Sequence, residues 1–422
     1  MSAPPRTARA SWHGKANAVV LTYLAASAVA AIVHATGHGS LWLVVHLFLL
    51  GAVTNAIVIW TVHFTATLLQ APASAPHTAS RRLVALNLGV LGVLVGVTTD
   101  NSVPTVAGAA LVAGVIATHV RALVRTVGIR RNSRFANAVR FYWAAAVALV
   151  VGIAAGIALT FHLSPDWHSR LYSSHVHLNL FGWVALTVLG TEFTLWPMVL
   201  HTRIVDGVER AARRALLLCT TGLALTVAGL LAAARPLTAA GLTLYAAGVC
   251  CCLDPFVRTA RQRLPRSPAA WMLAAGTGWL AVGVALDLAA VLRSGDPIEL
   301  AHHIEGVVPW LLAGFAAQTL LGALTYLLPV VLGGGPVGGR RLAAVLDRLG
   351  TTRTLALNLG VVLLALPVRA FAVTIGWTLI AAAFTSFVAL AVVAVTGAAT
   401  DARHRKRDLL PTPDQARARR QP

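Results

Sequence analysis

The stretch SHVHLNLFGWV, residues 174–184, opens an apolar run that continues to Trp196 and Pro197. Its two histidines, His175 and His177, are two positions apart. On an α-helix this spacing turns the side chains by roughly 200°, so the two rings point to nearly opposite sides. Two such imidazoles do not readily bind one metal ion, but each can serve a separate cofactor on its own side of the helix. Histidine is costly inside an apolar helix unless it has a partner, so the pair indicates a functional site.

The composition around this stretch is that of a membrane protein. Of the 422 residues, 57% are hydrophobic and 11% are charged, and the mean hydropathy is +0.74. Apolar runs of about 20 residues, the length that crosses the hydrocarbon core of a bilayer, recur along the chain. The net charge of +20 does not indicate nucleic-acid binding, because the arginines lie in short loops between apolar runs. The four cysteines form no CxxC or CxxCH motif, so neither a zinc ribbon nor covalently attached heme is indicated.

The apolar runs predict twelve transmembrane helices in an all-α polytopic bundle. We divide the chain into a short N-terminal segment (1–16), a membrane domain (17–398) and a disordered basic tail (399–422). Clusters of arginine fall in alternate loops, and the loops between them carry at most one arginine each. By the positive-inside rule both termini are cytoplasmic, in a multi-pass protein of the plasma membrane. The predicted spans are 17–35, 41–68, 83–99, 103–126, 141–162, 174–200, 214–234, 237–253, 270–292, 300–332, 354–371 and 374–398.

Three of the predicted spans share a sequence pattern. The segment HLFLLGAV starts at His46 and HLNLFGWV starts at His177, so both read HLxLxGxV. Later in the sixth span, VLG at 188–190 and WP at 196–197 match LLG at 320–322 and LP at 328–329 in the tenth. Spans two, six and ten are four apart, which predicts three four-helix units with pseudo-threefold packing. Chance agreement among Leu, Gly and Val is the alternative.

The pattern places His46 and His177 at equivalent depths on related helices, beneath the outer surface. Each is followed five residues later by glycine, which lets a helix or a flat macrocycle approach closely. Two facing neutral imidazoles at one depth are what six-coordinate heme iron requires, so we predict a heme b between His46 and His177. The alternative is that both are polar core residues bonded to backbone or water.

Four further histidines on the outer side are candidate metal ligands. His175 faces away from His177, where it can ligate a second heme or a copper ion, or simply face water. His302 and His303 are adjacent near the start of the tenth span, about 100° apart on a helix. Together with His175 or His162 they predict part of a copper site, and a surface or lid role is the alternative.

The His175-Val176-His177 motif with the segment Leu180–Val184 resembles the His-x-His helix of subunit I of the heme-copper oxidases. It is most similar to the C-type oxidases and nitric oxide reductases, and the related NnrS-like family also suits twelve spans. The same region, with YLLPVVLGGGP at 326–336, is similar to the membrane half of actinobacterial copper oxidase or nitrite reductase-like proteins. The resemblance implies that His177 and His46 bind a low-spin heme and that His175 binds a second heme. The motif stands on span six rather than ten, and residues 214–234 hold no histidine, so the oxidase reaction itself stays open.

We therefore expect a membrane protein that binds heme, with copper left open, and that serves electron transfer or the handling of nitric oxide, oxygen or copper. Whether it is an oxidoreductase of heme-copper oxidase type stays open. The expected partners are membrane lipid and a separate copper oxidase or nitrite reductase-like protein, and not nucleic acid. A secondary transporter or metal permease without heme is the main alternative, because twelve helices with internal repeats suit it equally. A membrane anchor without a cofactor is a third interpretation.

Overall fold

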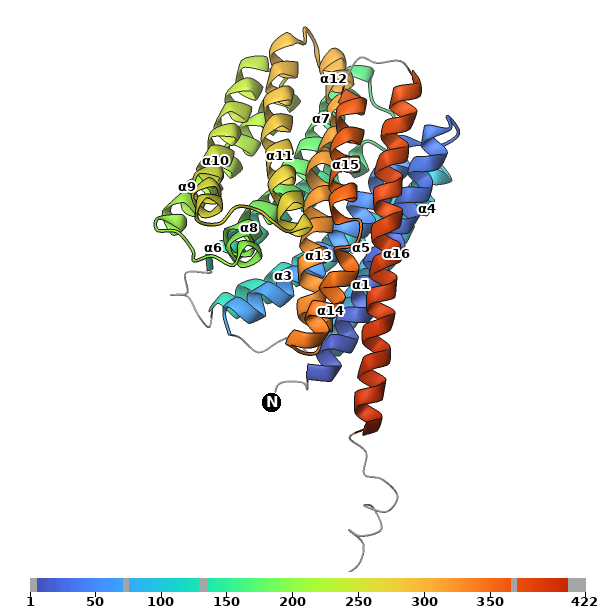
Figure 1. The fold of residues 1–422 in the computed structure, drawn as a ribbon. Coiled ribbons are helices and arrows are strands. Elements are labelled where there is room, and N and C mark those ends of the chain that lie inside the picture. The colour runs from blue at the N-terminus through green and yellow to red at the C-terminus, as the bar shows by residue number, and fades with distance from the viewer. Residues whose placement is uncertain (1–5, 71–75, 129–135, 366–369, 409–422) are drawn as a thin grey trace, which may run out of the picture.

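The structure is a computed structural model of the chain, and it describes residues 6–70, 76–128, 136–365 and 370–408. Within these ranges the regular secondary structure is entirely helical, and the helical segments join into 13 helices. Most of them run along one direction and form an elongated bundle (Figure 1). The all-α class predicted from the sequence is confirmed.

Eleven of the described helices are long and apolar enough to cross a membrane. Helix α4 (Pro76–Thr98) illustrates what surrounds them, because four of its large apolar side chains recur at helical spacing and are each at least half exposed: Val84, Leu88, Leu91 and Val95. A continuous apolar stripe of this kind is exceptional on a water-soluble protein, whereas the acyl chains of a bilayer solvate it. The fold is therefore that of a polytopic membrane protein.

The helices follow one another as three units, each with four main helices. The first unit contains α1 (Arg6–Ala35), the continuous helix α2 (Leu41–His46), η1 (Leu47–Val53) and α3 (Thr54–Leu68), then α4 (Pro76–Thr98) and α5 (Ser102–Gly128). The second contains α6 (Ala136–Ala158), the continuous helix α7 (Pro165–His177), η2 (Leu178–Ala185) and α8 (Leu186–Leu200), then α9 (Val208–Leu231) and α10 (Arg235–Gln262). The third contains α11 (Pro268–Arg293), the continuous helix α12 (Pro297–Trp310), η3 (Leu311–Ala317) and α13 (Gln318–Leu332), a short α14 (Pro336–Leu346), then α15 (Gly350–Ala365) and α16 (Ala370–Asp408).

The second span of every unit carries a π-helical segment in its middle. The three segments, η1, η2 and η3, stand at matching positions of the repeat, and each contains a glycine at the same place: Gly51, Gly182 and Gly314. A Cβ added at any of these glycines would overlap a side chain of the unit's own first span, which is Tyr23, Ala148 and Trp279 respectively. Glycine is thus required because two helices approach closely at this point.

These three long helices form the interior of the bundle. Their most apolar windows are 61, 83 and 78% buried, whereas the corresponding windows of the other eight spans are only 28–44% buried. Around them the last span of each unit packs against the first span of the next: α5 on α6, α10 on α11, and α16 on α1. The units therefore close into a ring, which confirms the predicted pseudo-threefold repeat.

Eleven described helices, and not the twelve predicted, are long and apolar enough to span a membrane, and α15 is the one that falls short. Other differences from the predicted elements lie at helix ends. The apolar pattern predicts the sixth span from 174, but α7 begins at Pro165, where the Ser164 hydroxyl accepts the backbone N–H of Trp167. A polar first turn of this kind does not appear in a search for apolar runs. The composition predicts a disordered tail from 399, but α16 continues to Asp408, and residues 409–422 lie outside the described part.

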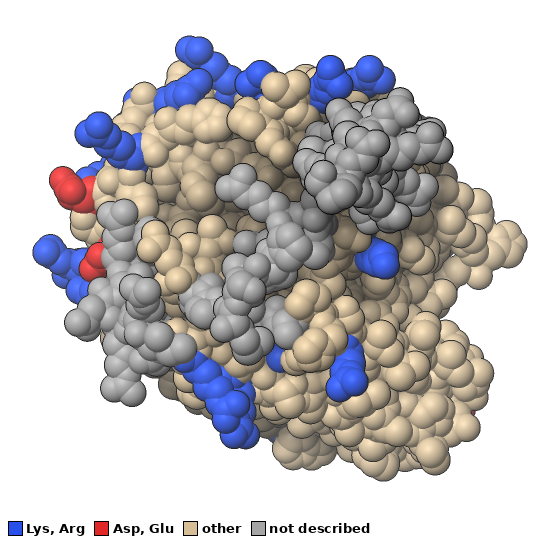
Figure 2. Space-filling model, turned by 90° about the horizontal axis from the view of Figure 1, so that it is seen from below, with Lys and Arg blue, Asp and Glu red and all other residues tan. Residues whose placement is uncertain are grey.

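The basic residues gather at the end of the bundle where the N-terminus lies. Figure 2 shows this face, with Lys and Arg side chains around its rim and few Asp or Glu side chains among them. Arg81 near the start of α4, Arg125 near the end of α5 and Arg261 near the end of α10 belong to this end, because consecutive spans alternate in direction. The candidate site lies toward the opposite end.

Candidate functional site

His46 is the last residue of α2, directly before η1, and its ring is half-buried. Its Nδ1 lies 2.8 Å from the backbone oxygen of Trp42, one turn earlier. Since a carbonyl oxygen only accepts, Nδ1 must carry the hydrogen, and in the neutral ring the lone pair is then on Nε2. The Trp42 indole stacks on the imidazole, with ring centroids 4.0 Å apart. The ring is thus held in one orientation by its own helix.

His175 lies on α7 and is held by the neighbouring helix α6. Its Nδ1 is 2.8 Å from the backbone oxygen of Gly152, so this nitrogen also carries the hydrogen and leaves a lone pair on Nε2. One turn further along α6, a Cβ on Gly156 would meet the ring at 2.8 Å from Cε1. Only glycine at 156 therefore lets the His175 ring lie against α6.

The structure brings the His46 and His175 rings together across the boundary between the first and second units. Their centroids are 6.3 Å apart and their planes differ by 21°. Neither Nε2 atom has a hydrogen-bond partner among the described residues. The rings are close to parallel, and their separation would leave room for one metal ion held by both Nε2 atoms at about 2.0–2.1 Å. Ligating histidines typically donate their other N–H to a backbone carbonyl or carboxylate, as both rings do here.

His177 lies on the other side of the same helix and is buried. Its Nδ1 bonds the backbone oxygen of Ser173, and its Nε2 lies 2.7 Å from Oδ2 of Asp287 on α11. Both ring nitrogens are therefore engaged within the protein. The sequence correctly separated His175 and His177 onto opposite sides, but the predicted pairing of His177 with His46 was wrong, and His175 takes that place.

The closed arrangement of the three units explains why His46 lies beside His175 and not beside His177. In a closed ring, equivalent residues face equivalent boundaries and do not face each other. His46 of the first unit therefore faces the second unit, and His177 of the second unit faces the third. Matching depth on related helices, which the sequence pattern did indicate, was not enough to place the two rings opposite one another.

The same repeat explains why His46 keeps a free nitrogen and His177 does not. Gly156 on α6 and Asp287 on α11 are equivalent positions, with the same offset that relates Ala148 to Trp279 and His46 to His177. At the boundary between the second and third units the carboxylate of Asp287 binds His177. At the boundary between the first and second units a glycine replaces that carboxylate, and the His175 ring fills the space.

The structure does not gather the predicted copper ligands. His302 and His303 are exposed on the first turns of α12, where His303 Nδ1 bonds the Ser294 hydroxyl at 2.9 Å, and His162 is exposed in the connection before α7. In the described ranges no three His, Cys, Asp or Glu side chains lie close enough to share a metal ion. Copper binding by these histidines stays a prediction.

Three contributors to the paired-histidine site were not identified from the sequence as such: the Trp42 carbonyl, the Gly152 carbonyl and Gly156. The two carbonyls carry no sequence signal. Gly156 could have been found by aligning the first spans of the units, which sets it against Asp287. No family model matches this chain, and a comparison with curated proteins finds no match.

Proposed function

We propose that this protein binds a heme b in the membrane, that His46 and His175 would hold it, and that it serves one-electron transfer near the extracytoplasmic surface. The observation that carries the proposal is the pair of half-buried imidazoles whose Nδ1 atoms are bound to carbonyls and whose Nε2 atoms bond to none of the residues that the structure describes. Two nitrogen ligands complete the coordination of an iron that already has four from a porphyrin, whereas most other protein metals need three or four side chains. A two-coordinate cuprous ion is the second metal that this donor set fits.

The residues of this chain have defined tasks in that proposal. Bound heme iron supplies an electron carrier that cycles between two oxidation states. The Trp42 and Gly152 carbonyls keep both Nδ1 atoms protonated and so present the Nε2 lone pairs. The indole of Trp42 covers one face of His46, and α6 supports His175. The two histidines and the two residues whose carbonyls bind them all lie on helices, which hold a site more rigidly than loops do.

The wider assignment rests on the resemblance to heme-copper oxidase subunit I and on charge. The arginine-rich end fits the cytoplasmic side of the plasma membrane, with both termini there. On the extracytoplasmic side, the protein that exchanges electrons with the heme would be a separate copper oxidase or nitrite reductase-like protein. The substance handled would be nitric oxide, oxygen or copper. A secondary transporter is less favoured, because the three central helices pass through their π segments without the unwound breaks typical of transporter sites.

The test is absorption spectroscopy of the purified full-length protein made with sufficient heme supply. We expect a reduced-minus-oxidised spectrum of a six-coordinate b-type heme and about one iron per chain. The variants His46→Ala and His175→Ala each lose it, because one imidazole no longer holds the second axial position. His177→Ala keeps the heme spectrum, since that ring bonds Asp287.

The matched control is His168→Ala, an exposed histidine on the same helix α7 as His175. This variant keeps the full heme content of the wild type. A colourless wild-type protein without iron would end the heme proposal, and one equivalent of copper in its place, lost in both His46→Ala and His175→Ala, would assign the pair to copper. An unchanged heme spectrum in both variants would also overturn the assignment.

A further inference from the structure

A pocket lies at the end of the bundle opposite the N-terminus, between α7, the α9–α10 turn and the α11–α12 turn. Its volume is about 60 Å³, and it is partly open to the outside. Six polar side chains line it, among apolar and small residues: Arg170, Ser173, Arg235, Thr238, Ser294 and Asp296. The pocket does not include His46 or His175, so a ligand bound there does not depend on the proposed heme.

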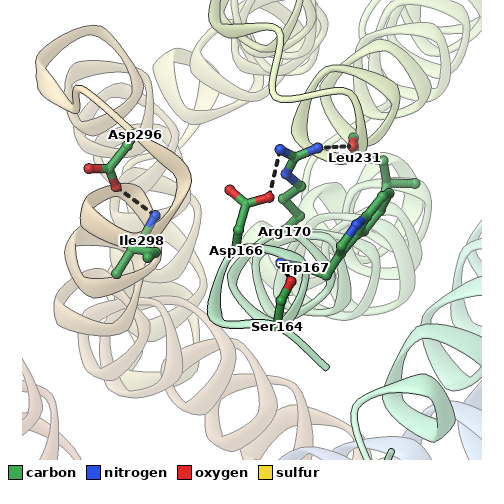
Figure 3. Close-up of polar contacts among 7 residues, drawn as sticks. All are labelled: Ser164, Asp166, Trp167, Arg170, Leu231, Asp296 and Ile298. Carbon is green, nitrogen blue, oxygen red and sulfur yellow. Dashed lines mark hydrogen bonds and ion pairs between the residues drawn. The ribbon is translucent and has the colours of Figure 1, made fainter. Parts of the chain in front are cut away.

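Arg170 reaches from α7 to the end of α9 and still has a free donor. Its guanidinium donates to the Leu231 carbonyl at 3.2 Å and binds Asp166 at 2.6 Å, as Figure 3 shows. Its Nε–H is buried and has no partner within the described residues. The hydroxyl of Ser173, three residues later on the same helix, is also unpartnered there, and Ser173 is only 1% exposed.

Arg235, at the start of α10, enters the pocket from the other side. One of its Nη atoms donates to the Ser294 carbonyl at 3.2 Å, at the end of α11, and no other bond is made by its guanidinium among the described residues. The Leu231 and Ser294 carbonyls each accept a bond from one of the two arginines. Oδ1 of Asp296 accepts the N–H groups of Ile298 and Glu299 at the start of α12. Besides the carboxylate of Asp296, the pocket thus presents three donors without a partner among the described residues: the Arg170 Nε–H, the Ser173 hydroxyl and the remaining N–H groups of Arg235.

We propose that this pocket binds a phosphate-type oxyanion, either free phosphate or the phosphate of a lipid headgroup. Guanidinium groups match phosphate oxygens in geometry and charge, and a hydroxyl that is buried without a partner gains its missing hydrogen bond when an anion accepts it. The three donors come from two helices and converge on one pocket.

The experiment measures binding by titration calorimetry on the full-length protein, purified in uncharged detergent and phosphate-free buffer of fixed ionic strength. The first probe is inorganic phosphate. The second is phosphatidylglycerol in nanodiscs, with phosphatidylcholine nanodiscs as reference and mass spectrometry for co-purified lipid. Ser173→Ala is the least disruptive variant, because its hydroxyl makes no bond that folding needs. We expect it to weaken binding by roughly tenfold, the loss of one hydrogen bond to a charged group, and Arg235→Gln to weaken it at least as much.

The matched control is Arg293→Gln, an exposed arginine near the same end that bonds the Ala289 carbonyl and does not line the pocket. Saturable phosphate binding that weakens in Ser173→Ala and Arg235→Gln but not in Arg293→Gln supports a free oxyanion. The same pattern with phosphatidylglycerol alone supports a lipid phosphate. No saturable binding of either probe, or equal weakening in all three variants, overturns the proposal.

Discussion

At the scale of single residues, the buried contact between His177 and Asp287 joins the second unit to the third. Oδ2 of Asp287 bonds His177, Oδ1 has no partner among the described residues, and Asp287 is 3% exposed. Both side chains line a small cavity of about 10 Å³ whose other walls are apolar, including Phe181 and Leu311. Such a pair is stable only while both members are present.

Asp287→Ala is therefore expected to lower the free energy of unfolding by about 3 kcal/mol, because His177 loses its partner among apolar walls. The measurement is reversible unfolding in detergent. Replacing both residues with leucine is expected to cost much less, since no polar group is then left without a partner. Stability of Asp287→Ala equal to that of the wild type would show that the contact contributes nothing.

Gly156 gives a second prediction at this scale. An alanine there places a Cβ against the His175 ring, so the ring must move away from the Gly152 carbonyl and from His46. We expect Gly156→Ala to lower heme content at least severalfold, measured as heme per protein. Gly278→Ala on α11 is the matched control, because nothing lies within 4 Å of its added Cβ. Equal heme content in the two variants would argue against the placement of His175.

At the scale of elements, the three π segments are the features that make the central helices differ from ordinary spans. A π segment widens one turn of the helix and is typically found at functional positions. In the first two units the π segment starts directly after a histidine that faces the next unit, His46 before η1 and His177 before η2. The π segment therefore sets the rotation of α7 relative to α8, and with it the directions of His175 and His177.

Deleting one residue from η2, such as Leu180, is expected to restore α-helical geometry and to rotate α7 by about 100° relative to α8. His175 then no longer faces His46, and His177 no longer faces Asp287. We expect a large loss of both stability and heme content, measured on the same preparation. A deletion in the α1–α2 connection, at Gly37, serves as control, since it leaves all three π segments intact. Wild-type behaviour of the η2 deletion would mean that the π segment does not orient these histidines.

The helices were largely predictable, whereas the partners of the histidines were not. The second span was predicted at 41–68 and is found at Leu41–Leu68, because its apolar run is bounded by polar loops. The π segments were not predicted, because one extra residue in a turn does not change an apolar run. The contact of His46 with His175 depends on how the units close into a ring, and that closure is set by helix packing far away in the sequence, such as α16 on α1.

At the scale of the whole molecule, the three units share one plan but carry different polar groups. In the first unit Asn55 and Asn87 exchange hydrogen bonds between its second and third spans, and in the third unit Gln318 and Asn358 do the same. In the second unit Leu186 stands at the matching position of the second span. That unit instead carries His177 and Glu192, which accepts a bond from Thr277 of the third unit. His177 and Glu192 thus connect the second unit to the third, while the two amide pairs each act within one unit.

The position of the two termini is the last prediction and depends on α15. Eleven helices are long enough to span a bilayer, and α15 has 16 described residues, about 24 Å of helix against a hydrocarbon core of about 30 Å. If α15 also crosses, the number of spans is even and both termini lie on the arginine-rich, cytoplasmic side. We therefore expect a fluorescent protein fused after Pro422 to be fluorescent and an alkaline phosphatase fused there to be inactive. An alkaline phosphatase inserted in the α9–α10 turn at Ala233 is expected to be active. Active phosphatase at the C-terminus would mean that α15 does not cross the membrane and that the third unit has only three spans.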